Sequence, residues 1–123
     1  MVKKEKQALP EGALETVEES GGISEIYRAL PEEETAILLK DIYHACSDIY
    51  RIKILFMLTK QPLCVCIIRE VLDISDSRLS YHLKILQKAG LISGTSKGTW
   101  IIYELTKKGR FFSDLNIKIS GKV

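Results

Sequence analysis

One stretch of the 123-residue chain constrains its fold more than any other. Residues 65–90, "VCIIREVLDISDSRLSYHLKILQKAG", have the pattern of two helices joined by a tight turn at residues 73–75. Ser75 is suited to cap the start of the second helix, and Gly90 to take the left-handed conformation that ends it. Three leucines at i, i+4 and i+7 place one face of this helix against a core: Leu79, Leu83 and Leu86. The opposite face is therefore free to contact something else.

A β-hairpin is predicted directly after the two helices. The sequence "LISGTSKGTWIIYELT" reads as two strands, at residues 91–94 and 99–105, with a turn through Lys97 and Gly98. Apolar residues at helical spacing predict three further helices, at residues 32–45, 47–60 and 107–119. We therefore expect a mainly α fold with a β-hairpin (α+β), built from about five helices and two strands.

The helix at residues 47–60 is expected to lie in the core. Ser47 or Asp48 can cap its start, and Pro62 stops it. Its broad buried face is expected to hold five apolar residues: Ile49, Ile52, Leu55, Phe56 and Leu58.

Composition fits one small globular domain with flexible ends, because 46% of the residues are hydrophobic and 28% are charged. Residues 1–22 are rich in Glu and Lys and contain Pro10, so we expect a disordered tail there. Residues 23–34 are interpreted as an N-terminal arm, residues 35–118 as the folded domain, and residues 119–123 as a C-terminal tail.

The sequence predicts a cytoplasmic protein without a membrane partner. The longest apolar run, at residues 64–68, is far too short to cross a bilayer, and the N-terminus lacks the apolar centre of a secretion signal. Three cysteines are an odd number and too few for a disulfide framework. The thiols are therefore expected to be reduced and to have a chemical role.

Charge is distributed unevenly along the chain. Residues 1–35 hold four basic and nine acidic residues, a net charge of −5, and the remaining residues hold 14 basic and seven acidic, a net charge of +7. Such a split is typical of a protein that binds a polyanion with its folded domain and not with its N-terminal tail. The alternative is solvated charge without a partner.

The free face of the helix after Ser75 has donors and a basic group that suit double-stranded DNA, where they can reach base edges and phosphates in a major groove. The candidate contacts on this helix are Ser75, Ser77, Arg78, Ser80, Tyr81, His82 and Lys84. His82 adjoins the apolar Leu83, so it either touches phosphate or hydrogen-bonds within the domain. Lys97, at the hairpin tip, either meets phosphate or minor groove or is an ordinary solvated lysine.

The motif "LCVC" places Cys64 and Cys66 one residue apart. Side chains two apart on an intact helix point about 200° from each other, so the pair can bind one ion only where the helix start is frayed or bent. A soft ion bound to both thiolates would change the orientation of the turn that supports the second helix. Ion binding and DNA binding would then compete for the arrangement of this turn. The alternative is that both cysteines are small buried hydrophobes.

Four stretches resemble the winged helix-turn-helix repressors of the arsenical-resistance (ArsR/SmtB) family: "CSDIYRIKIL", "LCVC", "SRLSYHLKILQKAGLI" and "GTWIIYEL". The resemblance covers residues 35–112 and implies a winged helix-turn-helix homodimer that represses a resistance operon by binding operator DNA. It implies no obligatory cofactor. Its inducer would be arsenite, antimonite or another thiophilic metal ion on Cys64 and Cys66, since two thiolates favour soft, low-coordinate ions over tetrahedral zinc.

Several positions depart from the pattern of this family. Arsenic sensors with this motif often have an Asp after the second cysteine and sometimes a third cysteine three residues on, where this chain has Ile67 and Arg69. Cys46 is a candidate third metal ligand, although its position corresponds to an apolar core residue in relatives. The N-terminal arm lacks the cysteines of cadmium-type relatives, and the last helix has Asp114 but no His for a zinc site.

Two alternatives of other classes use the same thiols. A redox-responsive regulator would form an intermolecular or strained local disulfide in oxidant. A thiol enzyme or metal-transfer protein is disfavoured, because no general base is apparent near the pair. We therefore expect a DNA-binding regulator that is not an enzyme.

Overall fold

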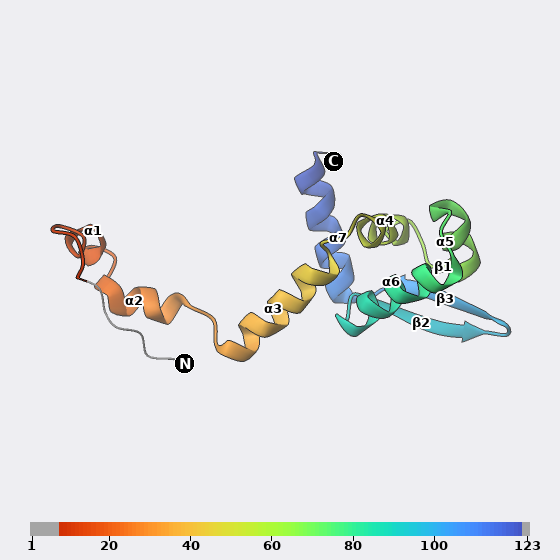
Figure 1. Cartoon of the computed structure of the whole chain (residues 1–123), viewed down its shortest axis with the longest axis horizontal. Coiled ribbons are helices and arrows are strands. Elements are labelled where there is room, and N and C mark those ends of the chain that lie inside the picture. Colours follow the sequence, from red (N-terminus) through yellow and green to blue (C-terminus); the bar gives the residue numbers. More distant parts are fainter. Residues whose placement is uncertain (1–7, 122–123) are drawn as a thin grey trace. The chain divides into compact units, whose positions relative to one another are not determined.

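The computed structural model describes residues 8–121, and the chain divides into two compact units, Met1–Ile37 and Leu38–Val123. In the first unit, helices α1 (Glu15–Glu18) and α2 (Gly22–Ala29) precede the start of α3 (Glu33–Ala45) (Figure 1). Helix α1 lies within the tail predicted to be disordered, where local hydrogen bonds to the Ala13 carbonyl close one helical turn. Residues 1–7 and 122–123 of the two predicted tails lie outside the described residues. The proposed domain boundaries at residues 22, 34 and 118 stay predictions.

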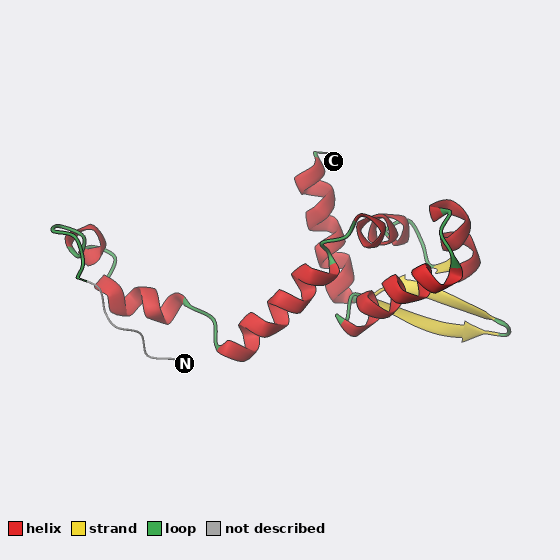
Figure 2. Cartoon of the chain, viewed as in Figure 1, coloured by secondary structure: helices red, strands yellow, loops and turns green. Residues whose placement is uncertain are grey.

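The second unit combines the end of α3 with four helices and a small antiparallel sheet (Figures 1 and 2). The helices are α4 (Ile49–Leu58), α5 (Val65–Leu72), α6 (Asp76–Lys88) and α7 (Lys107–Ser120). The predicted mainly α fold with a β-hairpin is confirmed. Among the described residues no helix is long and apolar enough to cross a membrane.

The sheet has three strands where the sequence predicted two. Strands β2 (Ile92–Lys97) and β3 (Trp100–Leu105) form the predicted hairpin, and the extra strand β1 (Leu63–Cys64) pairs with the other side of β3. In this pairing Leu63 lies opposite Tyr103 and Cys64 lies opposite Ile102. Strand β1 is too short to show a hydrophobic period, so sequence periodicity could not find it.

The core forms where α4, α5 and α6 meet the sheet. The three leucines expected on the inner face of α6 are buried: Leu79, Leu83 and Leu86. The predicted buried face of α4 is confirmed at Leu55 and Leu58 and wrong at Ile49, which is 70% exposed, and at Ile52, which is exposed as well. The buried face instead follows i, i+3, i+4 and i+7 through Arg51, Ile54, Leu55 and Leu58. A buried arginine therefore occupies the first core position of α4.

Hydrogen-bonded caps fix the helices around this core. The Asp48 carboxylate accepts from the Arg51 backbone N–H at 3.1 Å, and the Ser75 hydroxyl accepts from the Arg78 N–H at 3.3 Å, as the sequence predicted. Gly90 follows α6 with φ +77°, the left-handed conformation expected of it. Thr106 caps α7 and also donates to the Gly90 carbonyl at 2.6 Å, so the start of α7 is tied to the end of α6.

Candidate DNA-binding face and thiol pair

The outer face of α6 is exposed to solvent. Six of the seven residues of this helix and its cap that were predicted to contact DNA are exposed: Ser75, Ser77, Arg78, Ser80, Tyr81 and Lys84. Lys97 is also exposed and ends β2 at the hairpin turn. The structure thus offers a protruding helix face of hydroxyl groups and cations, together with a basic hairpin tip. These are the features that major-groove reading and phosphate contacts require.

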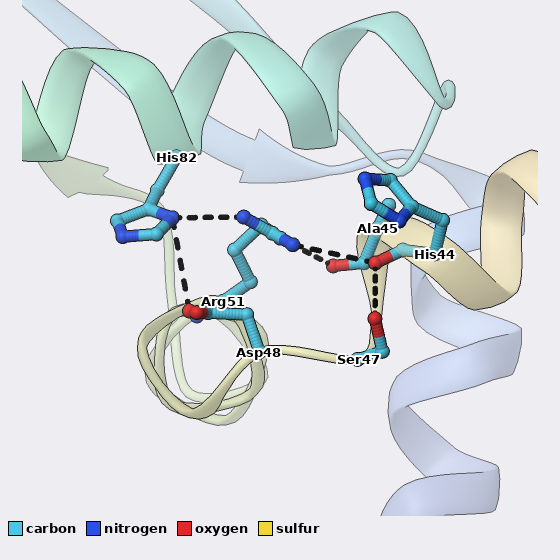
Figure 3. A network of polar contacts seen from close by, with 6 residues as sticks. All are labelled: His44, Ala45, Ser47, Asp48, Arg51 and His82. Atoms are coloured by element: carbon cyan, nitrogen blue, oxygen red, sulfur yellow. Dashed lines mark hydrogen bonds and ion pairs between the residues drawn. The ribbon is translucent and has the colours of Figure 1, made fainter.

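His82 is the exception, because its side chain is buried between α6 and α4. The Arg51 guanidinium Nη1 lies 3.0 Å from His82 Nδ1, and a guanidinium has only donors, so Nδ1 accepts this hydrogen bond (Figure 3). The other guanidinium nitrogens of Arg51 donate to the Ala45 carbonyl at 2.8 Å and the His44 carbonyl at 3.3 Å. Burial and these contacts support the structural alternative for His82 over a contact with phosphate.

The protonation of this network follows from its surroundings. Burial lowers the pKa of His82, the positive charges of Arg51 and Arg78 lower it further, and the Asp48 carboxylate 3.7 Å away opposes them. Burial alone would raise the pKa of Asp48, but the Arg51 backbone N–H and the charges of His82 and Arg51 outweigh it and lower the pKa. Above its lowered pKa the imidazole is neutral, and it supplies the charge that lowers the pKa of Asp48 only when it is protonated.

A cleft of about 460 Å³ opens beside this network on the outer face of α6. Residues from the start of α4 and from α6 form its walls: Asp48, Ile49, Tyr50, Ser77, Arg78, Tyr81 and His82. Three of these residues, Ser77, Arg78 and Tyr81, belong to the predicted DNA-contact set. The start of α4 thus borders the candidate DNA-binding face, which the sequence did not indicate.

The two cysteines of "LCVC" lie on either side of the start of α5. Cys64 is the extended N-cap residue, with φ −65° and ψ 145°, and Cys66 lies in the first helical turn. The Cys64 sulfur accepts a hydrogen bond from the Cys66 backbone N–H at 3.4 Å. Cys64 thus has extended backbone while α5 stays intact, which is the kind of bent helix start that the sequence argument asked for. Binding of one ion by both sulfurs stays a prediction.

Hydrogen bonding makes the two thiols unequal. A hydrogen bond from the Cys66 side chain lowers the pKa of Cys64, and backbone N–H groups and the nearby Arg69 charge lower it further. Donating that hydrogen bond raises the pKa of Cys66, as do burial and the proximity of Cys64. Cys64 is therefore the thiol that ionises first, and thiolates are the form that binds soft metal ions.

Cys46 is not brought together with this pair. Its side chain packs against the hydrophobic core after the end of α3, and burial raises its pKa while the Arg51 charge opposes the rise. Within residues 8–121 no three His, Cys, Asp or Glu side chains form a cluster that could hold a metal ion. Cys64 and Cys66 are two thiols at the α5 start, and a ligand role for them or for Cys46 stays a prediction.

Sequence reasoning also missed two sets of contacts to α6, one from α5 and one from α4. Arg69 on α5 forms an ion pair of 2.8 Å with Asp76, the first residue of α6. Tyr50 on α4 contacts both His82 and Arg78 on α6. The Asp48 and Arg51 positions were visible in the motif "CSDIYRIKIL", but nothing in the motif indicated their partner on α6.

Comparison with known proteins places these features in a family. Residues 49–93 match the family described as "Bacterial regulatory protein, arsR family". The chain is 42% identical over 64 residues to the arsenical resistance operon repressor of Bacillus subtilis, covering 51% of this chain and 61% of the relative. It is 37% identical over 67 residues to the transcriptional repressor SdpR of the same organism, covering 54% of this chain and 74% of the relative. Less than two thirds of the arsenical resistance repressor is therefore covered.

Solved structures show the same fold. HlyU from Vibrio cholerae superposes with a TM-score of 0.66 at 26% identity, covering 72% of this chain and 97% of that chain. A winged helix-turn-helix DNA-binding domain from Mycobacterium bovis superposes with a TM-score of 0.63 over 76% of this chain, so the predicted winged helix-turn-helix fold is confirmed.

Proposed function

Because the chain belongs to the arsR family of bacterial regulatory proteins, we propose that it is a transcriptional repressor whose operator complex dissociates when a thiophilic ion binds Cys64 and Cys66. The observation that carries this proposal is the position of Cys64. This one residue caps α5 and pairs with β3, so the predicted sensor and the predicted DNA-binding elements share a single junction. The relatives are named as repressors and regulators, and we propose no catalytic activity.

DNA binding is proposed to use α6 in the major groove and the hairpin at its flank. The inner leucines of α6 fix the helix to the core, so the exposed residues Ser77, Arg78 and Tyr81 are presented on a rigid support. Lys97 extends the basic surface to the hairpin tip, where a phosphate contact adds affinity without sequence discrimination. The net charge of +7 downstream of residue 35 favours the same polyanionic partner.

Arsenite or antimonite is the proposed inducer class. Both ions prefer thiolates, and the lowered pKa of Cys64 favours its thiolate form. Two cysteines of one chain would leave the third position of a three-coordinate ion to a hydroxide or a small-molecule thiol. Because the described residues hold no three-ligand cluster, tetrahedral zinc is a poor match for this site.

Release of DNA is proposed to follow from the two connections of α5. A metal-bound Cys64 thiolate would no longer accept the Cys66 N–H in the same way, so the first turn of α5 would shift. Strand β1 would carry that shift to β3 and the hairpin, and the Arg69–Asp76 ion pair would carry it to the start of α6. Ligand and DNA would then favour different arrangements of the same elements, which is the requirement for coupling between two sites.

A homodimer is proposed as the DNA-binding species. Three apolar residues of α7 follow one another at i, i+4 and i+8 and are exposed in the single chain: Phe111, Leu115 and Ile119. An apolar helix face of this kind is usually covered by a partner. The family resemblance also implies a dimer through the outer helices, and a two-fold dimer would read a two-fold-related operator.

The test is fluorescence anisotropy of a labelled duplex taken from directly upstream of the gene, with reduced protein and increasing arsenite. Cys64→Ser and Cys66→Ser are expected to bind DNA within about a factor of two of the wild type, because serine is close to cysteine in size and, at position 64, is also a good N-cap. Arsenite should dissolve the wild-type complex and leave both variant complexes intact.

Cys46→Ser is the matched control, since it removes a thiol outside the pair and should still respond to arsenite. Release that is unchanged in Cys64→Ser and in Cys66→Ser would contradict the assignment of the sensor. A wild-type protein that binds the upstream duplex no better than a scrambled one would contradict the repressor itself.

A redox-responsive regulator is the second candidate, favoured by the hydrogen bond between the two thiols and the lowered pKa of Cys64. A peroxide would take two electrons and two protons from a thiol pair, forming one disulfide and water. Mass spectrometry of peroxide-treated protein should then find two thiols lost per disulfide. Finding all three thiols free after treatment would remove this candidate.

A further inference from the structure

Tyr50 of α4 contacts the DNA-binding face although it lies outside α6. The Arg78 guanidinium lies over the Tyr50 ring, 4.9 Å from the ring centroid. The same ring lies 5.6 Å from the His82 ring, with an angle of 34° between the two planes. Tyr50 therefore stands between one exposed cation of α6 and one buried imidazole of α6.

A network of polar contacts lies behind Tyr50. His82 is buried, accepts a hydrogen bond of 3.0 Å from Arg51, and lies 3.7 Å from the Asp48 carboxylate (Figure 3). Arg51 is itself anchored to the Ala45 carbonyl at 2.8 Å. Because each member of this network is held by the next, the His82 ring forms a fixed surface for Tyr50. A side chain that packs on a fixed surface has few rotamers left to sample.

The contact with Tyr50 restricts the orientation of the Arg78 side chain. An arginine on an exposed helix face samples many rotamers, and ordering it upon binding costs conformational entropy. A guanidinium over an aromatic face is attracted by the ring quadrupole, and its planar edge stays free to donate hydrogen bonds. A guanidinium held in this way can meet a guanine edge or a phosphate with two parallel hydrogen bonds.

We propose that Tyr50 is a positioning residue that holds Arg78 in the orientation in which α6 reads DNA. The inference rests on the proposed function, because it deepens the DNA-binding step and not the response to metal. The cleft of about 460 Å³ beside Tyr50, Ser77 and Tyr81 leaves the free edge of Arg78 accessible. The sequence preference of this repressor thus depends on a residue of α4 that makes no base contact of its own.

A second cation near the same ring provides a matched control. The Lys53 ammonium group lies 5.9 Å from the Tyr50 ring centroid, farther than the Arg78 guanidinium. Lys53 is on α4 and is not among the α6 residues that face DNA. Lys53→Ala removes a cation from the ring without touching Arg78, and it should leave the sequence preference unchanged.

The test compares the affinity for the upstream duplex with that for a scrambled duplex of equal composition. Tyr50→Leu is expected to weaken binding to the upstream duplex about threefold to tenfold and to leave the scrambled duplex unaffected. Tyr50→Phe keeps the ring and should restore the wild-type ratio. In an Arg78→Ala background, Tyr50→Leu should cause no further loss, because the two residues act through one contact.

Incorporating pentafluorophenylalanine at residue 50 keeps the ring size and reverses its quadrupole, so it separates the cation contact from simple packing. The ratio of upstream to scrambled affinity should fall with this ring and stay high with Phe. The proposal would be overturned if Tyr50→Leu kept the wild-type ratio of upstream to scrambled affinity, or if Tyr50→Leu still caused a loss in the Arg78→Ala background. It would also be overturned if Phe and pentafluorophenylalanine at residue 50 gave equal ratios. A wild-type protein that does not distinguish the duplexes would instead refute the proposed function.

Discussion

His82 and Arg51 form a contact that ties the stability of the second unit to pH. The pKa of His82 is lowered in the folded chain by burial and by the Arg51 and Arg78 charges, whereas the unfolded chain has an ordinary histidine pKa near 6.5. The unfolded state therefore takes up a proton first as the pH falls. The free energy of unfolding should decrease as the pH drops through about 6.5 and level off below the pKa of the folded state.

Urea unfolding at pH 7.5 and pH 5.5 measures this effect. His82→Gln, which can still accept from Arg51, should show a smaller decrease between the two pH values than the wild type. The exposed His44 is present in both proteins and serves as an internal control. An equal decrease in both proteins would mean that another group carries the pH dependence.

At the same scale, the sequence predicted individual residues well where their role is local. The Ser75 cap, the left-handed Gly90 and the inner leucines of α6 depend on neighbours a few positions away, and the structure confirms them. The buried role of Arg51 depends on His82, which lies 31 positions away. An arginine in an apolar helix gives no sign of such a partner, so its burial was missed.

Among the elements, the hairpin is predicted to make a separable contribution to DNA affinity. Lys97 lies at its tip and is exposed, so a phosphate contact there would release condensed counterions from the duplex. Lys97→Ala should weaken binding at low salt for the upstream and scrambled duplexes alike. The slope of log affinity against log salt should become less steep by about 0.9 per contact, or by about two for a dimer.

Anisotropy titrations between low and physiological salt give this slope. Lys40→Ala is a suitable control, because it removes an exposed lysine of α3 that pairs with Asp41. An unchanged slope for Lys97→Ala would show that the lysine is an ordinary solvated turn residue. A change confined to the upstream duplex would instead indicate that Lys97 discriminates sequence.

The elements with a clear hydrophobic period were predictable from the sequence, and the two-residue strand β1 was not. Helices α3 to α7 and the hairpin follow from apolar spacing and turn residues, because each has enough residues to show a period. Strand β1 has two residues and exists only because β3 lies beside it. The thiol pair was therefore found by its motif, while the extended backbone of Cys64 beside β3 depended on a contact far along the chain.

For the whole molecule, the exposed apolar face of α7 predicts association. Phe111 is 66% exposed and Ile119 is 75% exposed in the single chain. The double variant Phe111→Glu/Ile119→Glu should be a monomer in sedimentation velocity under conditions where the wild type is a dimer. It should also bind the upstream duplex at least tenfold more weakly, or by about 1.4 kcal/mol or more, because one protomer contacts only one half-site.

Lys118→Glu places the same charge on an exposed polar position of α7 and should leave the dimer intact. A double variant that remains a dimer would place the subunit interface elsewhere. A double variant that is monomeric and still binds DNA at wild-type affinity would contradict the proposal that the dimer is the DNA-binding species.

Cys64 is both a residue of strand β1 and the N-cap of α5, and this arrangement has a genetic consequence. Serine at this position would keep the cap and the backbone pairing with β3, and it would remove only the soft ligand. One base change in a cysteine codon is enough to make serine. If the proposed dimer and inducer are correct, a cell with both alleles would assemble mixed dimers in which one half no longer responds to the inducer. Such alleles should therefore be dominant super-repressors, and selection for loss of induction should recover them at this codon.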